Sequence, residues 1–184
     1  MQDPFFFGYG SLVHRATHSY PMAAAAKLHG YRRVWRATTL REFAFLSVER
    51  HEHTTIEGLV AQVPNADWVA LDEREHAYQR YDVTDQVESE PARSEIQVYS
   101  VAPEFYAADG QEYTLLLSYI DVVVQGFLRE FGNAGVSRFF DTTVGWPRQI
   151  LNDRQAPIYP RFQSLSDTEL ELVDSHLRAL EIDV

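Results

Sequence analysis

Residues 5–12 read Phe-Phe-Phe-Gly-Tyr-Gly-Ser-Leu, a short aromatic run that leads into a turn containing glycine. The three phenylalanines are β-prone and too few to open a helix, so they predict the first buried strand. Gly8 and Gly10 bracket Tyr9 and let the backbone turn sharply and approach another group. Free N–H groups at such a strand end suit an anionic or carbonyl-bearing ligand, although an ordinary exit from a strand has the same composition.

The overall composition is typical of one globular domain. The 184 residues are 45% hydrophobic and 23% charged, without a repeat or a composition break. The lack of cysteine excludes a disulfide framework, a thiolate nucleophile and a cysteine metal site, and it fits a reducing compartment. A formal net charge of −11 argues against nucleic-acid binding through phosphates. Six of the 16 basic residues nevertheless fall between Lys27 and Arg50 and could form a local positive face.

The chain shows no pattern of a signal peptide or a membrane span. An acid stands at position 3, and no basic segment precedes an apolar one. The most apolar run, Tyr113 to Phe131, contains Ser118, Asp121 and Gln125, which favours a buried helix. We therefore expect a cytoplasmic protein that binds neither membrane nor nucleic acid, and the sequence carries no signal of oligomeric state.

Strand patterns fill the first 101 residues. Besides the opening strand, they lie at Lys27–Ala37 with a bulge at Gly30, Phe43–Val48, Thr55–Val63, Tyr81–Val87 and Glu95–Val101. A helix over about residues 67–79 interrupts them.

Helical patterns dominate the second half. They predict a helix from Tyr119 that stops at Gly132-Asn133, a short one near 136–141, and a terminal helix that begins with a capping box at Ser166 and Glu169. Residues 142–162 look like a long surface connection. The order of strands followed by helices predicts an α+β fold with a small mixed β-barrel or sheet and packed helices.

Two motifs suggest chemistry but lack the necessary partners. His51-Glu52-His53 could offer two metal ligands from a strand, but no third ligand is near, and a hairpin turn explains the residues better. Ser11 lies on a tight turn as a nucleophile would. Its surroundings are not a Gly-x-Ser-x-Gly elbow, and neither His14 nor His18 is an evident partner.

Glu75 has a more informative position. On a helix it would share a face with Leu71 and Tyr78, whereas Glu73 would point about 200° away. A carboxylate on the apolar side loses solvation, so its pKa rises and it becomes a competent base near neutral pH. The alternative is a structural ion pair with Arg74 or Arg80.

Together, Phe7-Gly8-Tyr9-Gly10-Ser11-Leu12 and Leu71-Asp72-Glu73-Arg74-Glu75 resemble the two signature segments of the gamma-glutamylcyclotransferase-like family. Similar intermediate features are the 30–35 strand, the 57–60 strand, Tyr81, and a helix with Ser118-Tyr119-Ile120-Asp121. The resemblance covers residue 5 to about 130. We therefore expect a single domain over 1–184, with residues 133–184 as a C-terminal extension that packs on it.

The resemblance implies a small mixed β-barrel and a role for each matching residue. Tyr9, Gly10, Ser11 and Leu12 would hold the gamma-glutamyl group with their backbone, and Glu75 would be the general acid and base. Tyr81 resembles a tyrosine that lines the same cavity. The α-amine of the substrate attacks its own γ-carbonyl, so the products are 5-oxoproline and a free amine, and no metal or cofactor is needed.

The sequence leaves the exact substrate open. The Phe-Gly-Tyr-Gly-Ser-Leu form and the Tyr31-Arg32-Arg33-Val34-Trp35 strand look closest to the glutathione-directed, ChaC-type branch, but the C-terminal part departs from it. Glutathione, a gamma-glutamyl amino acid and a gamma-glutamylamine all remain candidates. The competing interpretation is a non-catalytic module of the same fold that binds a small molecule or a protein.

Overall fold

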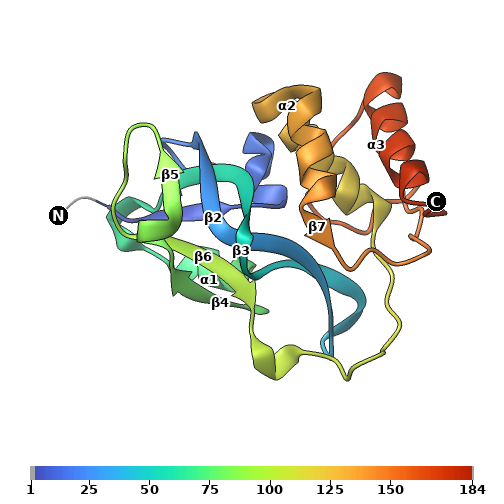
Figure 1. Ribbon diagram of the computed structural model, residues 1–184, viewed down its shortest axis with the longest axis horizontal. Helices are drawn as coiled ribbons and strands as arrows, with labels where there is room; N and C mark the ends of the chain where they lie inside the picture. Colours follow the sequence, from blue (N-terminus) through green and yellow to red (C-terminus); the bar gives the residue numbers. More distant parts are fainter. Residues whose placement is uncertain (1–2, 184) are drawn as a thin grey trace.

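A long antiparallel hairpin forms the centre of the computed structural model, which describes residues 3–183 (Figure 1). Its two strands are β2 (Ala24–Thr38) and β3 (Arg41–Gln62). The opening strand β1 (Phe5–Gly8) pairs antiparallel with β3 and parallel with β6 (Ile96–Val101). The strand predicted from the three phenylalanines is therefore an inner strand of the sheet.

Shorter strands complete a mixed, seven-stranded sheet. Strand β4 (Tyr78–Asp82) lies outside β6, whereas β5 (Val87–Ser89) and β7 (Thr143–Val144) both pair with β2. The sheet curls into a half-barrel, and three α-helices accompany it within residues 3–183 (Figure 1). This arrangement confirms the predicted α+β class.

The curl depends on the hairpin. The pairing register shifts between His29 and Tyr31, where Gly30 adopts a φ of 76°, so the predicted bulge is confirmed. The prediction of two strands with a turn at His51–His53 is wrong, since β3 runs unbroken through these residues. Residues 51–54 have no partner in β2 and bulge out opposite Gly30, but the segments on both sides of them pair with β2, so the chain keeps its direction.

The first helix is shorter than predicted. Helix α1 spans Val69–Arg74, and the chain then turns to enter β4 at Tyr78, where it pairs with β6. The expected helix over 67–79 therefore ends early, because pairing with the sheet replaces the helical bonds of its last turn.

The later helices agree in place with the prediction. Helix α2 (Leu117–Asp141) consists of two helical parts separated by a kink at Gly132, whose φ is 65°, so the predicted helix end at this glycine and the predicted short helix near 136–141 are both confirmed. At its start, the hydroxyl and the N–H of Ser118 both donate to Asp153. Helix α3 (Asp167–Ala179) begins with the predicted box of Ser166 and Glu169.

The hydrophobic core lies between the sheet and α2. Phe5 and Phe7 belong to this core and Phe6 to a smaller cluster on the opposite face, as the strand period of two requires. Val173 and Leu177 of α3 belong to the same core, and α3 packs beside α2 (Figure 1). Within residues 3–183 no helix is long and apolar enough to cross a membrane.

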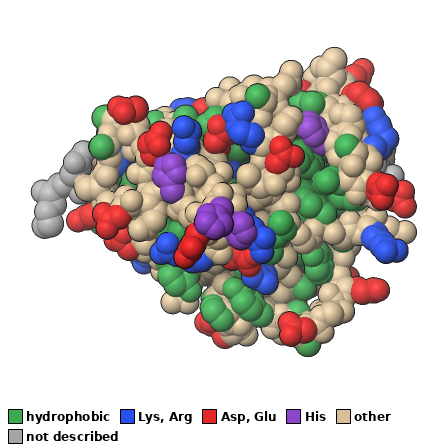
Figure 2. Space-filling model, viewed as in Figure 1, with side chains coloured by type: hydrophobic (Ala, Val, Ile, Leu, Met, Phe, Trp, Pro, Cys, Tyr) green, Lys and Arg blue, Asp and Glu red, His purple; other side chains and the backbone are tan. Residues whose placement is uncertain are grey.

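The basic residues between Lys27 and Arg50 do not form one positive face. Arg33 is wholly buried, and Arg32 and Arg36 both pair with Glu49. On the face shown in Figure 2, basic side chains are interspersed with acidic and histidine side chains. Such mixing is the pattern of a solvated strand surface.

Candidate active site

The loop that follows β1 is held by buried hydrogen bonds. The Tyr9 hydroxyl donates to the Tyr99 carbonyl at 2.7 Å, and Leu46 offers a second acceptor at 3.3 Å. A short 3₁₀ helix, Ser11–Val13, continues the loop. The first N–H groups of such a turn lack partners within the helix, so they are available to a ligand or a neighbouring side chain.

The guanidinium of Arg33 holds the loop by a hydrogen bond to its backbone. Its Nε donates to the Tyr9 carbonyl at 2.8 Å, and its other nitrogens donate to Thr142 and to the Glu57 carbonyl. The guanidinium also lies over the rings of Phe127 and Phe139, at 4.8 and 5.2 Å from their centroids. Burial lowers the pKa of Arg33 to about 9, so it remains a cation at neutral pH.

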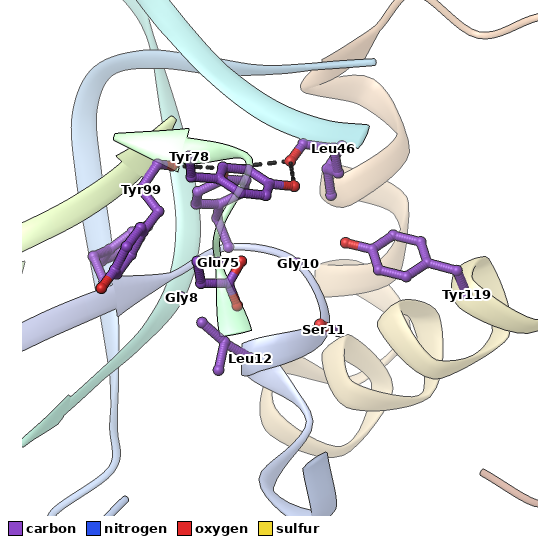
Figure 3. A pocket seen from close by; sticks show the side chains of 11 residues that line it. Gly8, Gly10, Ser11, Leu12, Leu46, Glu75, Tyr78, Tyr99 and Tyr119 are labelled. Atoms are coloured by element: carbon purple, nitrogen blue, oxygen red, sulfur yellow. Dashed lines mark hydrogen bonds between the residues drawn. The ribbon is translucent and has the colours of Figure 1, made fainter. Parts of the chain in front are cut away.

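Glu75 lies directly after α1 and faces this loop (Figure 3). Its N–H donates to the Leu71 carbonyl at 2.9 Å, the last bond of the helix, and its side chain is only 16% exposed. Burial raises the pKa of the carboxyl above its usual value, although the positive charges of Arg74 and Arg161 counter part of the effect. The environment of Glu75 thus suits an acid that exchanges protons.

Arg74 joins Glu75 to the loop. Its Nε lies 3.1 Å from Glu75 Oε1, and its Nη1 donates to the Thr17 carbonyl at 2.8 Å. Its Nη2 lies 3.5 Å from the Ser11 hydroxyl. The ion pair considered from the sequence is therefore present, but it is largely buried: the Arg74 side chain is 10% exposed.

The loop and Glu75 enclose a small cavity of about 30 Å³. A larger cavity of about 290 Å³ adjoins it and shares three of its lining residues, which are Leu46, Tyr78 and Tyr119. The full lining of the small cavity is Phe7, Gly8, Tyr9, Gly10, Ser11, Leu12, Leu46, Glu75, Tyr78, Tyr99 and Tyr119. Together the two cavities have the size of a small-molecule site.

The structure brings five of the six predicted site residues together. Tyr9, Gly10, Ser11 and Leu12 line the small cavity with Glu75. Tyr81 does not: it is 40% exposed, and its hydroxyl donates to Gln79.

The placement of Tyr81 corrects the sequence prediction, and Tyr78 takes its place in the lining. The two tyrosines are three residues apart on β4, so their side chains point to opposite faces of the sheet. The Tyr78 hydroxyl donates to the Leu46 carbonyl at 2.9 Å. If α1 is ended at Arg74, the alternation of side chains along β4 places Tyr78 and Tyr81 on opposite faces, and only one of them can line the cavity.

Tyr119 is another lining residue that the sequence did not single out. Its hydroxyl receives a hydrogen bond from the Ser11 backbone and points toward the loop (Figure 3). Burial raises its pKa, so the phenol is neutral. It lies only two residues after the start of α2, where Ser118-Tyr119-Ile120-Asp121 resembles the family's later helix but carries no separate sign of a lining residue.

The other sequence candidates do not assemble into sites. The His14 ring bonds Gln125 and Arg129, and His18 Nε2 lies 3.1 Å from the Leu12 carbonyl, so neither bonds the Ser11 hydroxyl. His51 bonds Thr54. In the described part of the chain, no three His, Asp or Glu side chains are placed to hold a metal ion.

A family model described as gamma-glutamyl cyclotransferase, AIG2-like, matches residues 6–118. The chain belongs to this family. The matched segment holds the loop after β1 and Glu75, and it ends at the beginning of α2. Among curated proteins, no sequence matches the chain significantly.

Solved structures agree with this family in fold. A structure named gamma-glutamyl cyclotransferase is 15% identical over 95% of this chain and 99% of its own, with a TM-score of 0.60. A human protein described as uncharacterized gives the same values. YkqA from Bacillus subtilis is 20% identical over 79% of this chain and 57% of its own, with a TM-score of 0.54. At these identities the likeness concerns the fold.

Proposed function

We propose that the protein is a gamma-glutamylcyclotransferase in which Glu75 is the general acid and base. The observation that carries the proposal is the position of Glu75, a largely buried carboxylate that lines one small cavity with the loop of residues 9–12. An acid with a raised pKa beside the backbone N–H groups of a tight loop has the components that an intramolecular acyl transfer requires.

The first step closes a ring. At neutral pH the α-amine of a gamma-glutamyl substrate is an ammonium, and Glu75 removes one proton so that the nitrogen can attack the γ-carbonyl carbon. Nucleophile and carbonyl belong to the same molecule, so the protein needs only to fold the substrate into the reactive shape. The negative charge that develops on the carbonyl oxygen is stabilised by N–H groups of the loop, each contributing roughly 3–4 kcal/mol in comparable sites.

The second step releases the amine. The bond between the γ-carbon and the leaving nitrogen breaks as Glu75 returns its proton to that nitrogen. The ring nitrogen, which still carries a surplus proton, gives it up through Glu75 to the released amine, which leaves as an ammonium. The products are 5-oxoproline and a free amine, so atoms and charge balance without another reactant. The substrate class includes gamma-glutamyl amines, amino acids and peptides, glutathione among them.

One observation favours the alternative, a non-catalytic binding module. Arg74 pairs with Glu75, and a carboxylate that serves only a structural ion pair needs no reaction. Against this stands the net rise of the Glu75 pKa, since the effect of burial exceeds that of the arginine. An enzyme has a use for an acid in such an apolar position, whereas a binding module would bear its cost without benefit.

A panel of gamma-glutamyl compounds tests the proposal. The purified protein is incubated with each compound, and 5-oxoproline is measured by mass spectrometry. Glu75→Gln should abolish the product, whereas Glu73→Gln, a matched change at an exposed acid of the preceding helix α1, should retain it. Product that survives Glu75→Gln would reject the assigned base, and no product from any compound would support the binding module.

A further inference from the structure

The cavity of about 290 Å³ beside the proposed catalytic acid is almost entirely apolar or aromatic. It is lined by β2, β3 and the first residue of β4, by the start of α2, and by residues 158–160 of the C-terminal connection. Its side chains are Trp35, Arg41, Phe43, Ala44, Phe45, Leu46, Tyr78, Leu116, Tyr119, Ile158, Tyr159 and Pro160. A cavity of this kind accommodates a hydrophobic group of amino-acid size.

Two side chains of this lining, Trp35 and Arg41, have hydrogen-bond donors that are not fully used within the described part of the chain. The indole N–H of Trp35 is buried without a hydrogen-bond partner in the described part of the chain, although the residue is only 3% exposed. Most buried donors have a partner, so this N–H is an exception, and it belongs to a residue that lines the cavity. The indole N–H and the guanidinium of Arg41 can both donate hydrogen bonds, and neither can accept one.

Arg41 is the second group. Its guanidinium lies 3.6 Å from the ring centroid of Phe45, and its Nε donates to the Phe43 carbonyl at 3.2 Å. Within residues 3–183 it has no ion pair with a carboxylate. Stacking fixes the plane of the guanidinium and leaves its terminal nitrogens available to a bidentate acceptor.

The charge around the two cavities has the opposite sign to that of the whole protein. The chain carries a net −11, yet Glu75 is the only acid among the described residues that line either cavity. Arg41 lines the larger cavity, and the charges of Arg74 and Arg161 act on Glu75. A positive site in an acidic protein attracts an anionic ligand to this place and not to the rest of the surface.

We infer that the larger cavity receives the leaving group, and that this group is a hydrophobic amino acid whose carboxylate pairs with Arg41. The inference rests on the proposed cyclotransferase activity and narrows its substrate class to gamma-glutamyl derivatives of aromatic or branched amino acids. Leu46, Tyr78 and Tyr119 line both cavities, so a dipeptide can extend from the loop of residues 9–12 into the apolar space. The side chain occupies the aromatic lining, and the carboxylate meets the donors.

Three substrates test the carboxylate pairing and the hydrophobic pocket separately. Gamma-glutamylphenylalanine has both the ring and the carboxylate, gamma-glutamylphenethylamine lacks the carboxylate, and gamma-glutamylglycine lacks the ring. We expect kcat/KM for the first to exceed that for each of the others by about tenfold, since a charge-assisted bond or a buried ring contributes at least ~1.4 kcal/mol. Equal values for the phenylalanine and phenethylamine compounds would overturn the carboxylate pairing. Equal values for the phenylalanine and glycine compounds would overturn the hydrophobic pocket.

Two variants test whether Arg41 is the residue that pairs with the carboxylate. Arg41→Gln should bring the ratio between the phenylalanine and phenethylamine compounds close to one. Arg50→Gln is the matched control, because Arg50 belongs to the same strand and lies over the ring of Tyr31, yet it does not line the cavity. Arg50→Gln should keep the wild-type ratio, and an unchanged ratio in Arg41→Gln would refute the assignment of Arg41.

A binding measurement distinguishes failure of the inference from failure of the proposed function. Titration calorimetry follows free L-phenylalanine, the expected product, with phenethylamine as its comparison. Binding of phenylalanine that weakens in Arg41→Gln supports the pocket even if no compound yields 5-oxoproline. Absence of binding, or equal binding of phenethylamine, counts against the pocket whatever the activity.

Discussion

The Nε atom of Arg33 donates a hydrogen bond of 2.8 Å to the carbonyl oxygen of Tyr9, and Arg33 is completely buried. A cation of β2 therefore holds the first residue of the loop that lines the candidate site. Its other partners are two oxygens, those of Thr142 and of the Glu57 backbone, and two aromatic rings. Within residues 3–183 the Arg33 guanidinium contacts neutral acceptors and aromatic faces and makes no direct bond to a carboxylate.

Arg33→Met should destabilise the protein by about 2–4 kcal/mol, because one buried and two partly buried acceptors lose their donor at once. Urea unfolding measures the change. Arg138→Met is the matched control: Arg138 bonds the carboxylate of Glu57 at the surface, and the loss of such a pair costs under about 1 kcal/mol. A similar small cost for both variants would contradict the role given to Arg33.

Glu75→Gln should stabilise the folded state increasingly as the pH rises. Burial raises the pKa of Glu75 in the folded protein, so its contribution is favourable below the usual value of 4.5 and is lost as the pH rises through the folded pKa. Each unit by which the pKa is raised corresponds to ~1.4 kcal/mol, or about 3 °C in Tm for a chain of this length.

Thermal unfolding of both proteins between pH 4 and 9 measures this difference in Tm. We expect the two values to converge at the acidic end and Glu75→Gln to be more stable at neutral pH and above. Glu73→Gln, at an exposed acid, should show no such trend with pH. A gap between wild type and Glu75→Gln that closes as the pH rises would mean that the folded pKa lies below 4.5.

The sequence predicted the components of the site better than their arrangement. Local patterns sufficed for β1, for the bulge at Gly30 and for the box at Ser166, because each depends on neighbouring residues. Glu75 is also buried, as its predicted place on the apolar side of a helix requires, although helix α1 ends at Arg74, one residue before it.

The errors come from contacts between distant residues. The end of α1 and the position of Tyr78 follow from the pairing of β4 with β6, some twenty residues further along the chain. The course of β3 through His51 follows from its pairing with β2 on both sides of residues 51–54. Local propensity cannot predict either feature, since it carries no information on which strands pair with each other.

Arg74→Gln should move the acidic limb of the kcat/KM profile to higher pH. The charge of Arg74 and its hydrogen bond lower the pKa of Glu75, so their removal lets the pKa rise further. The base then becomes deprotonated, and the enzyme active, only at a higher pH. Arg74→Lys keeps the charge and should shift the limb less.

Arg80→Gln serves as the control for this shift. Arg80 pairs with Asp72 at 2.9 Å and lies over the ring of Trp68, so its loss removes a comparable ion pair elsewhere near α1. The pH profile of Arg80→Gln should follow that of wild type. An acidic limb that stays in place in Arg74→Gln would show that a group other than Glu75 sets it.

Gly10→Ala should disturb the site through Tyr119. A Cβ at position 10 would lie 2.7 Å from the Tyr119 hydroxyl and 3.1 Å from Cδ2 of Leu46, so both side chains must shift. We expect a loss of about 1–3 kcal/mol in the free energy of unfolding. Tyr119→Phe removes the atom in closest conflict, and the double variant should recover about 1 kcal/mol relative to the sum of the single changes. Gly30→Ala, whose Cβ would meet no atom within 4 Å, should show no such coupling with Tyr119→Phe, and additivity of Gly10→Ala with Tyr119→Phe would disprove the contact.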